Sequence, residues 1–477
     1  MLETRSKWLA RATLVVAGIT ALRLLVLAFS KADIFVDEAQ YWLWGQNLDF
    51  GYYSKPPLIA WVIHATTELG GADSAFWIRV SAPIFHGATA LILGALTARV
   101  FGKSAAVWVA VSYVTLPIVA LGSLVISTDT IMAPFFAAGL LFYFRNLSEK
   151  RTTDALIAGV MIGLAFMSKY AGIYFFLGAG LAAIFLPHHR PSLKNTVALL
   201  AAFFLVISPN LIWNLGHELT TVDHTMDNIG WLRADGEGPV LHLRAFLEFF
   251  STQFVVMGPI LLFALLRSGW RPDREIAPLL LFSLPIIGLV CVQALLSKAY
   301  GNWAFAAFLA GTVAAIAWIA RRRLLWLWVS LAINGALTVA VPAVAILGEK
   351  IMVDGRPILL RNMGRDEISE EILALARQIQ PAAIVASDRD ILADLFLTGR
   401  NQEFPIRAIP AKGRPRNYYE QNFPLDARTD ETILYIGKAA PSECAGPEAL
   451  PAAVIETQGT AYENMSLRAY VVFAECF

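Results

Sequence analysis

The sequence predicts an all-α membrane domain of about 11 transmembrane helices, followed by a small α/β domain. Apolar residues make up 57% of the 477 residues and charged residues 16%, against about 45–50% and about 25% in soluble domains. The cations gather in alternate short loops, and the composition changes after Gly348. We therefore expect a membrane domain over 1–348 and a soluble domain over 349–477.

Eleven apolar segments are candidates to cross a bilayer. A spanning helix needs about 20 mostly apolar residues, because hydrocarbon offers no water to satisfy free backbone groups. The expected spans are 8–29, 76–98, 104–121, 128–145, 154–168, 171–186, 195–214, 247–266, 276–296, 302–320 and 324–347.

The loop charges orient these spans. Lys and Arg in short loops stay on the cytoplasmic side, and a cytoplasmic N-terminus makes every cytoplasmic loop short and basic. These loops carry Arg99 and Lys103; Arg145, Lys150 and Arg151; Arg190 and Lys194; Arg267, Arg271 and Arg274; and Arg321, Arg322 and Arg323. The outer loops are richer in acids. Eleven spans then predict a bacterial inner-membrane protein with a cytoplasmic N-terminus and a periplasmic C-terminal domain.

The C-terminal domain shows both helical and strand patterns. Asp366 to Ile379 has apolar residues at helical spacing, and short strand-like runs follow at 382–387, 432–437 and 470–475. Cys444 and Cys476 are the two cysteines outside the membrane domain. A periplasmic location permits a disulfide between them, and the sequence leaves open whether it forms.

Several function classes are excluded by composition and motifs. A net charge of +1 gives no basic surplus for non-specific binding of nucleic acid. The sequence contains no P-loop, no GxGxxG, no HExxH and no Cys-x-x-Cys pair. Nucleotide-driven transport, zincin chemistry and a zinc finger therefore have no support.

The first outer loop is the most informative segment. Asp37 to Leu48 has one polar face and one aromatic face, which indicates a helix lying in the membrane interface. A second amphipathic stretch follows at 57–69, where prolines fix the start of a helix. The simplest interpretation is that Asp37 and Glu38 complement the positive end of the helix dipole.

The order of motifs favours a catalytic interpretation. Asp37-Glu38 follows the first span, Ser-Lys-Pro-Pro at 54–57 comes about 18 residues later, and a soluble domain ends the chain. This order resembles the GT-C membrane glycosyltransferases, in particular the protein O-mannosyltransferase-like branch with the lipid A aminoarabinose transferases and the rhizobial lipid A galacturonic acid transferases. The resemblance implies a GT-C fold and an enzyme that takes a sugar from a polyprenyl-phosphate carrier with inversion.

The resemblance also implies roles for particular residues. The implied catalytic acids are Asp37, Glu38 and Asp129. The implied substrate-binding residues, with the lysines on the carrier phosphate, are Lys55, Lys169, Lys298, Tyr53 and Gln40. Two departures weaken an inference of the aminoarabinose donor and of a metal near this loop: the aminoarabinose transferases usually have Arg where this chain has Gln40, and an acid where it has Ser54.

Physical chemistry supports the same residues. Asp37, Lys55, Asp129, Lys169 and Lys298 all fall on the outer side in a topology derived from loop charge alone. Fixed ammonium groups stabilise the negative charge that grows on a departing phosphate. A carboxylate can take the proton of the acceptor, which is the role expected for Asp37.

Simpler interpretations exist for four of these residues. Lys55, directly before two prolines, could be a simple loop charge. Lys169 and Lys298 lie near span ends, where lysines commonly extend to the interface. Asp129 precedes the span at Thr130 and could be its N-cap.

A divalent metal is a further option. The long outer loop contains His217, His224 and His242 with Asp223 and Asp227. Because this spacing is unspecific, a solvated loop is the preferred interpretation, and no metal ligand is assigned.

Three hypotheses follow for the whole protein. The first is an inverting glycosyltransferase that moves a sugar from polyprenyl phosphate to lipid A or a related envelope glycolipid. The second keeps this donor and changes the acceptor to a protein Ser or Thr. The third is a transporter of lipid-linked sugars, although the sequence shows no repeated halves of the kind transporters have. Donor lipid, glycolipid acceptor and membrane lipids are the expected partners, and nucleic acid is not.

Overall fold

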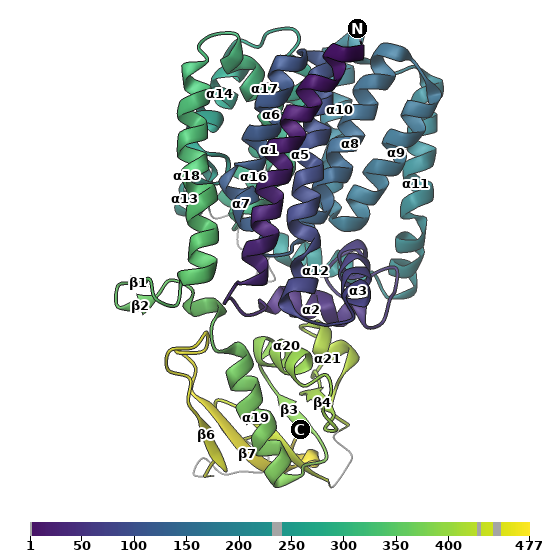
Figure 1. The fold of residues 1–477 in the computed structure, drawn as a ribbon. Helices are drawn as coiled ribbons and strands as arrows, with labels where there is room; N and C mark the ends of the chain where they lie inside the picture. Colours follow the sequence, from purple (N-terminus) through teal and green to yellow (C-terminus); the bar gives the residue numbers. More distant parts are fainter. Residues whose placement is uncertain (1, 231–240, 427–430, 442–449) are drawn as a thin grey trace. The chain divides into compact units, whose positions relative to one another are not determined.

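The computed structural model describes residues 2–230, 241–426, 431–441 and 450–477 (Figure 1). It divides into two compact units. The helical unit comprises Met1–Ala28, Asp49–Val62 and Arg79–Pro342, and the C-terminal unit comprises Phe29–Leu48, Ile63–Ile78 and Ala343–Phe477. Two segments of the first outer loop, 29–48 and 63–78, therefore belong to the C-terminal unit. The sequence had predicted a C-terminal domain that consists of residues 349–477 alone.

The helical unit is built from long apolar helices. Seven helices of 20 to 26 residues are long and apolar enough to cross a membrane: Trp8–Ala28, Ala75–Val100, Thr128–Glu149, Leu193–Gly216, Ala277–Leu296, Gly301–Ala320 and Leu325–Leu347. Three predicted spans are shorter helices, at Lys103–Val114, Thr152–Ser168 and Tyr170–Phe185. The polytopic all-α prediction is confirmed. Seven of the eleven predicted spans are helices long and apolar enough to cross a membrane, and three are shorter apolar helices.

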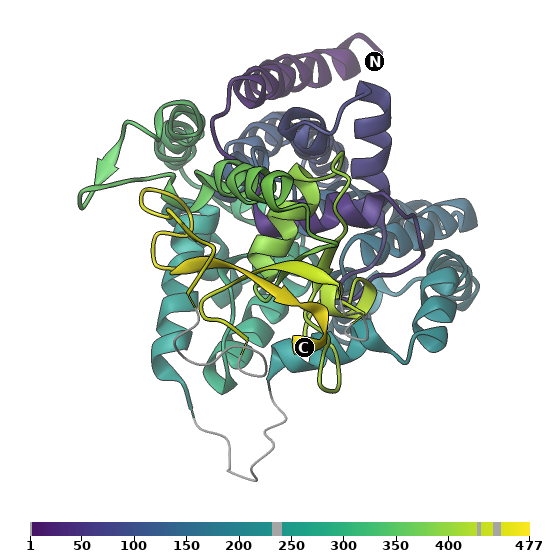
Figure 2. The same ribbon diagram turned by 90° about the horizontal axis from the view of Figure 1, so that it is seen from below.

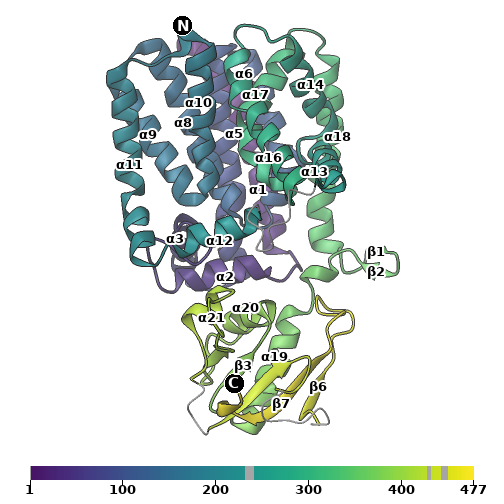
Figure 3. The ribbon, with the colours of Figure 1, turned by 180° about the vertical axis from the view of Figure 1, so that it is seen from behind.

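The individual helices of this unit are α1 (Leu2–Ala28), α5 (Ser81–Val100), α6 (Lys103–Val114), α7 (Pro117–Gly122), α8 (Thr128–Glu149), α9 (Thr152–Ser168), α10 (Tyr174–Phe185), α11 (Leu193–Gly216), α12 (Thr220–Ile229), α13 (Leu243–Met257), α14 (Pro259–Trp270), α15 (Ala277–Leu281), α16 (Leu284–Leu296), α17 (Phe305–Ala320) and α18 (Leu325–Leu347), with short 3-10 turns at Tyr170–Ile173, Pro187–His189 and Gly301–Ala304. Helices α8, α9 and α11 lie side by side (Figure 3). Helix α17 is buried along almost its whole length, whereas α1 lies at the periphery (Figure 2).

The predicted span at 247–266 is wrong as a single helix. The structure has α13 and α14 there, bent by 112° at Gly258. Gly258 has φ of 88°, a conformation open to glycine, and the following Pro259 disfavours helical geometry at the residue before it. A Gly-Pro pair thus turns the chain inside an otherwise continuous apolar segment.

The predicted span at 104–121 is also interrupted, between α6 and α7. The chain leaves the helix at Thr115 and Leu116 and starts again at Pro117. The buried side chain of Arg23 donates from Nη2 to the carbonyl oxygen of Val114 at 2.7 Å. Thr338 donates to the carbonyl of Thr115 at 3.1 Å. These donors satisfy carbonyls that the interrupted helix leaves without an intrahelical partner.

The loops predicted to be cytoplasmic gather at one end of the helical unit. A cavity of about 910 Å³ is lined there by the start of α1, the end of α5, the start of α6, the end of α8 and the connection from α10 to α11. Surface ion pairs link the same loops: Arg99 and Arg151 both contact Glu149, and Arg145 contacts Asp154. We refer to this end of the helical unit as the basic end.

The C-terminal unit contains a five-stranded mixed sheet. Its strands are β3 (Ile384–Ala386), β4 (Ile406–Ala408), β5 (Thr432–Gly437), β6 (Ala453–Ile455) and β7 (Leu467–Phe473), in the order β4-β3-β5-β7-β6. Strand β3 is parallel to β4 and β5, with Val385 opposite Tyr435, and β7 is antiparallel to both its neighbours. Parallel pairing of β3 to both its neighbours, with helices in the intervening connections, makes this an α/β unit, as predicted.

Besides most of the short helix α4 (Ala75–Arg79), five helices join this sheet in the C-terminal unit. These are α2 (Val36–Gly45), the end of α3 (Leu58–Gly70), α19 (Arg365–Ile379), α20 (Arg389–Thr398) and α21 (Tyr418–Asn422), and a small hairpin pairs β1 (Met352–Val353) with β2 (Arg356–Pro357). The predicted amphipathic helices of the first loop are confirmed as α2 and α3. Helix α2 packs on α20, and Trp44 meets the ring of Tyr418 edge-on at 5.8 Å.

Candidate active site

A buried polar cluster in the helical unit is built around Asp129. The Nζ atom of Lys169 donates to both carboxylate oxygens of Asp129, at 2.7 Å each. The side-chain amide of Asn302 donates to Oδ2 at 2.7 Å. The structure therefore brings two predicted residues, 40 positions apart in the chain, into direct contact and adds a third.

Helix termini position each member of this cluster. Ser127 is the N-cap of α8 and accepts a hydrogen bond from the backbone N–H of Thr130 at 3.3 Å. The interpretation of Asp129 as the N-cap is therefore wrong, and its carboxylate is directed to Lys169. Lys169 is the C-cap of α9 and has an extended backbone, which ends the helix and directs its side chain toward α8.

The ion pair is well shielded from solvent. The side chain of Lys169 is 17% exposed and that of Asp129 is 9% exposed, so Lys169 does not extend to the interface in the manner of a snorkelling lysine. An ammonium group has three N–H donors. Asp129 receives two of them, which leaves one donor that can bind an oxyanion.

Sequence reasoning did not assign Asn302. It lies in the 3-10 turn Gly301–Ala304 before α17, four residues after the predicted Lys298. A polar amide directly before an apolar span was the available signal, but an amide there is also common as a simple helix-start residue.

Tyr53 and Lys55 lie in a compact segment held by the helical unit. The backbone N–H of Tyr52 donates to the carbonyl of Lys55 at 3.2 Å, and the hydroxyl of Thr221 donates to the carbonyl of Tyr52 at 2.7 Å. The ring of Tyr53 meets that of His224 edge-on at 5.1 Å. These contacts fix the backbone from which the partly exposed Lys55 extends.

Lys298 lies between α16 and the Asn302 turn. Its Nζ is 5.8 Å from the centroid of the Tyr300 ring, and its carbonyl accepts from Gln293 Nε2 at 3.1 Å. Within the described part of the chain, the side chain of Lys298 makes no bond to Asp129. Asn302, four residues further along, is the residue of this segment that contacts Asp129.

The remaining predicted residues, Asp37, Glu38 and Gln40, lie on α2 in the C-terminal unit. Arg389, the first residue of α20, donates from Nη2 to Asp37 Oδ1 at 2.5 Å and from Nε to Gln40 Oε1 at 3.1 Å. Sequence reasoning missed Arg389. It lies 352 residues from Asp37, in a region with many arginines, and no local pattern distinguishes it from them.

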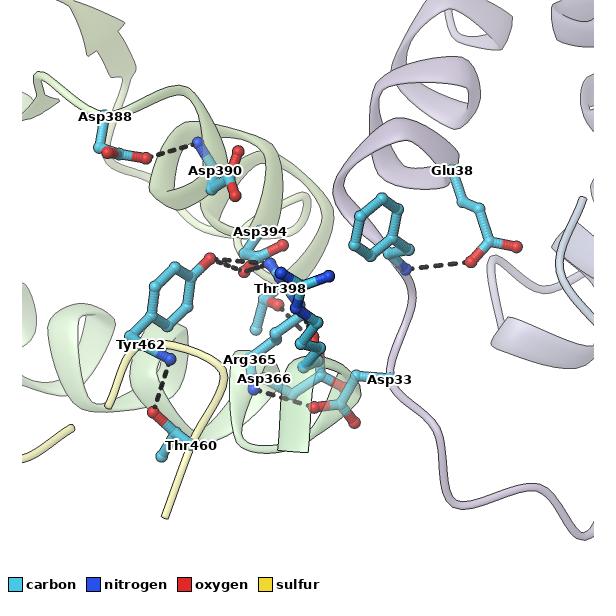
Figure 4. A network of polar contacts seen from close by, with 12 residues as sticks. Asp33, Glu38, Arg365, Asp366, Asp388, Asp390, Asp394, Thr398, Thr460 and Tyr462 are labelled. Atoms are coloured by element: carbon cyan, nitrogen blue, oxygen red, sulfur yellow. Dashed lines mark hydrogen bonds and ion pairs between the residues drawn. The ribbon is translucent and has the colours of Figure 1, made fainter. Parts of the chain in front are cut away.

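Glu38 has a structural role at the start of α2. Its Oε2 accepts the backbone N–H of Phe35 at 3.0 Å (Figure 4), which satisfies a donor at the helix N-terminus. The side chain is buried. This contact agrees with the simpler interpretation of Glu38 as a residue that stabilises the start of the helix. The side chain of Asp37 instead contacts Arg389.

A second charged cluster lies close to α2 in the same unit. Arg365 donates from Nη1 to Asp394 Oδ2 at 3.1 Å and to the hydroxyl of Tyr462 at 3.0 Å, and Tyr462 itself donates to Asp394 (Figure 4). The backbone N–H of Arg365 donates to Asp33 Oδ2 at 2.9 Å. This cluster ties α19 and α20 to the segment that leads into α2.

Burial and charge shift the pKa values in this unit. Burial raises the pKa of Asp394 to about 7, although Arg365 and the Tyr462 hydroxyl act in the opposite direction. For Arg389, burial lowers the pKa, but the charge and hydrogen bond of Asp37 outweigh it, so the net pKa lies above the usual value. Arg389 is therefore a permanent cation beside Asp37.

The candidate metal residues all lie among the described residues, whereas the candidate disulfide falls partly outside them. Among those that are described, no three His, Cys, Asp or Glu side chains group as metal ligands. His217 stacks on Trp213 at 4.0 Å, and His224 contacts Tyr53. Cys476 is disulfide-bonded, Cys291 is a free thiol, and Cys444 lies outside the described residues.

The chain is similar in sequence to known membrane glycosyltransferases. Residues 54–213 match the family model for dolichyl-phosphate-mannose-protein mannosyltransferase. The chain is 40% identical to the lipid A galacturonosyltransferase RgtD of Rhizobium johnstonii, over 97% of this chain and 98% of that protein. It is 25% identical to the lipopolysaccharide core galacturonosyltransferase RgtA of the same organism, over 89% and 87% of the two chains.

A solved structure has a similar fold. The crystal structure of ArnT from Cupriavidus metallidurans bound to undecaprenyl phosphate matches with a TM-score of 0.66 and 14% identity, over 95% of this chain and 97% of that one. The likeness extends through both units, so the predicted GT-C fold is confirmed.

Proposed function

Because the chain belongs to the family of the lipid A galacturonosyltransferase RgtD, we propose that it transfers galacturonate from a polyprenyl-phosphate carrier to lipid A. The chain is a membrane glycosyltransferase and a multi-pass inner-membrane protein. The observation that carries the substrate proposal is identity of 40% over 97% of the chain, since so long a match includes both units and every predicted site residue.

The proposed reaction is an inverting displacement. The acceptor oxygen attacks C1 of the sugar from the face opposite the carrier phosphate. The new C1–O bond forms as the C1–O bond to phosphate breaks, and the bonding electron pair remains on the phosphate. Asp37 accepts the proton of the acceptor hydroxyl, a step in which a positioned base typically contributes about 10²–10⁴-fold.

The lysines are proposed to bind the carrier phosphate. Lys55 and Lys298 would neutralise its growing negative charge, as fixed cations do where water is scarce. Lys169 retains one donor beyond its bonds to Asp129, and Asn302 holds the other side of that carboxylate. Asp129 is therefore proposed to orient Lys169. Tyr53 and Gln40 keep their proposed role in substrate binding.

The proposed topology follows from loop charge. Because the cationic loops of the basic end stay in the cytoplasm, the N-terminus is assigned to the cytoplasm. Residues 349–477 are assigned to a periplasmic domain, and the transfer to the periplasmic face. Since the family makes the chain an enzyme, the transporter hypothesis is set aside.

A protein acceptor is the second candidate. It is favoured by the match of residues 54–213 to a protein mannosyltransferase model, which covers a region that includes Lys55, Asp129 and Lys169. The proposed acceptor remains lipid A, because the relative matched over the full chain is named for it.

The test is sugar transfer in membranes that carry the wild type, Asp37→Asn or the control Asp354→Asn. Asp354 lies exposed in the β1–β2 turn at φ of 52°, where asparagine is well tolerated. Lipid A, total glycolipid and protein are followed by mass spectrometry. We expect wild type and control to add one uronic acid mass to lipid A, and Asp37→Asn to lose at least about 10²-fold in rate.

Two outcomes contradict the proposal. A wild type that modifies protein and leaves lipid A unchanged overturns the acceptor. An Asp37→Asn variant as active as Asp354→Asn removes Asp37 from the chemistry and returns it to a role at the start of α2. Expression and the unfolding transition are measured on the same samples, so that loss of folding is not read as loss of catalysis.

A further inference from the structure

Arg389 holds the proposed catalytic carboxylate from the far end of the sequence. Its guanidinium group contacts two residues one turn apart on α2, with Nη2 on Asp37 Oδ1 and Nε on Gln40 Oε1. A guanidinium is planar and its donors are fixed relative to one another. Two simultaneous bonds therefore fix the guanidinium relative to α2, and the bond from Nη2 holds Asp37 Oδ1 in place.

Arg389 is itself firmly placed. It is the first residue of α20, whose N-cap Asp388 accepts the backbone N–H of Asp390 at 2.8 Å (Figure 4). This cap fixes the backbone on both sides of Arg389. One turn further along α20, Asp394 is held by Arg365 and Tyr462, so the helix cannot rotate without breaking a buried charged cluster.

The contact leaves Asp37 able to react. Its side chain is 49% exposed, and that of Arg389 is 37% exposed. Oδ1 is occupied by Arg389, while Oδ2 accepts no bond from a residue in the described ranges. One oxygen is therefore held, and the other remains open to receive a proton from an acceptor.

We infer that Arg389 is a positioning residue for transfer: it orients the Asp37 carboxylate so that Oδ2 meets the acceptor hydroxyl. This inference rests on the proposed role of Asp37 as the proton acceptor. It makes the C-terminal region a required part of the catalytic machinery, although Arg389 touches Asp37 and Gln40 and not the reacting atoms. A displacement of a catalytic group by about 1 Å can cost about 10²-fold in rate.

The test compares Arg389→Gln with a matched control, Arg377→Gln. Arg377 on α19 makes the same kind of contact, with Nε on Gln402 Oε1 at 3.3 Å and Nη2 at 3.6 Å from Glu370 Oε2, and its side chain is 46% exposed. Initial rates of uronic acid transfer from the polyprenyl-phosphate donor to lipid A are measured with purified full-length protein. We expect Arg389→Gln to lower kcat by about 10- to 100-fold with KM for both substrates nearly unchanged, and Arg377→Gln to match the wild type.

Two further variants separate positioning from folding. Arg389→Lys keeps the charge but only one point of contact, so it should recover part of kcat. The double variant Asp37→Asn with Arg389→Gln should be no slower than Asp37→Asn alone, because Arg389 acts through Asp37. If Arg389 had only a structural role, Arg389→Gln would lower kcat by the same factor in the wild type and in Asp37→Asn. The loss of kcat would then parallel the loss of stability measured in the unfolding transition. If Arg389→Gln unfolds, kcat of Arg389→Lys is compared with that of the wild type instead.

The outcomes distinguish this inference from the proposed function. If Asp37→Asn abolishes transfer while Arg389→Gln and Arg377→Gln behave alike, the positioning role is overturned and the function stands. If Arg389→Gln slows the Asp37→Asn enzyme as much as the wild type, Arg389 acts elsewhere. If Asp37→Asn transfers normally, the catalytic assignment fails and the role of Arg389 fails with it.

Discussion

Asp129 and Lys169 neutralise each other where neither charge could remain stable alone. Both side chains are largely shielded from solvent, and an isolated buried charge carries a desolvation penalty of several kcal/mol. The pair therefore has a structural role. It ties the start of α8 to the end of α9, and Asn302 ties the same carboxylate to the start of α17.

We expect Lys169→Met to destabilise the protein by about 3–5 kcal/mol, because it leaves a carboxylate buried without its cation. Adding Asp129→Asn should recover much of this loss while transfer stays impaired. Chemical unfolding of the purified protein measures both. Lys194→Met is the control, since Lys194 is exposed at the basic end; equal effects of the two lysine variants would contradict the prediction.

The sequence predicted part of this centre. Asp129 and Lys169 were predicted because both match motifs of the resembling family and both fall on the outer side in a topology based on loop charge. Asn302 and Arg389 were not predicted from the sequence, for different reasons. An amide before a span has an ordinary structural explanation, and a contact across 352 residues leaves no trace in local periodicity.

At the scale of elements, the bend at Gly258 shapes the second half of the helical unit. Its φ of 88° is combined with a tight approach: a Cβ atom at this position would lie 2.2 Å from Asn334 Oδ1. Glycine is thus required both for the turn and for the packing of α18 against it. The bend also lets α13 and α14 occupy a segment that periodicity predicts as one span.

We expect Gly258→Ala to destabilise the protein by about 1–3 kcal/mol, the range for a residue forced into a sparsely populated backbone conformation. The matched control is Gly288→Ala. Gly288 lies inside α16 with no heavy atom within 4 Å of its Cβ position, so alanine there should be neutral or stabilising by up to about 1 kcal/mol. Thermal unfolding of both variants is the measurement, and indistinguishable midpoints would refute the argument.

Periodicity predicted the long elements well and the short ones poorly. The helix at Asp366–Ile379 corresponds to α19, and the three strand-like runs correspond to β3, β5 and β7. Strand β3 has three residues and lies inside the predicted run at 382–387, whereas β4 and β6, also of three residues each, were not predicted. Their pairing in the sheet depends on neighbours far away in the chain.

At the scale of the whole molecule, the compact units do not follow chain order. Segments 29–48 and 63–78 pack with 343–477, and segment 49–62 packs with the long helices. Loop charge and hydropathy describe the chain in sequence and so predict a boundary at a single point. An interleaved division needs tertiary contacts, such as Trp42 donating to Asp73 at 2.7 Å and Asp73 meeting Arg400 at 3.7 Å.

The C-terminal unit should lose stability as the pH rises toward neutrality. Burial raises the pKa of Asp394 to about 7 from 3.8, so between these values the folded protein retains a proton that the unfolded chain has released. This contribution is fully present below pH 3.8 and is lost as the pH rises through about 7. We expect the unfolding temperature of this unit to fall over that interval, and Asp394→Asn to flatten the dependence.

Calorimetry or near-UV circular dichroism across this pH range checks the prediction. Asp394→Asn keeps an oxygen acceptor for Tyr462 or Arg365, so its pH profile can be compared with the wild type at similar packing. Asp354→Asn, at an exposed turn, should retain the wild-type slope. A wild-type slope in Asp394→Asn would show that another group titrates.

The interleaved architecture also sets an order of events during protein synthesis. Ribosomes add about 5–20 residues per second, so the 352 residues between Asp37 and Arg389 take roughly 20–70 s to make. Throughout that time the nascent chain carries Asp37 without the arginine that orients it. A chain released early would possess the membrane helices and the carrier lysines, yet its carboxylate would be unaligned. If Arg389 positions Asp37 as inferred, the carboxylate is aligned for transfer only after the segment around Arg389 has been synthesised.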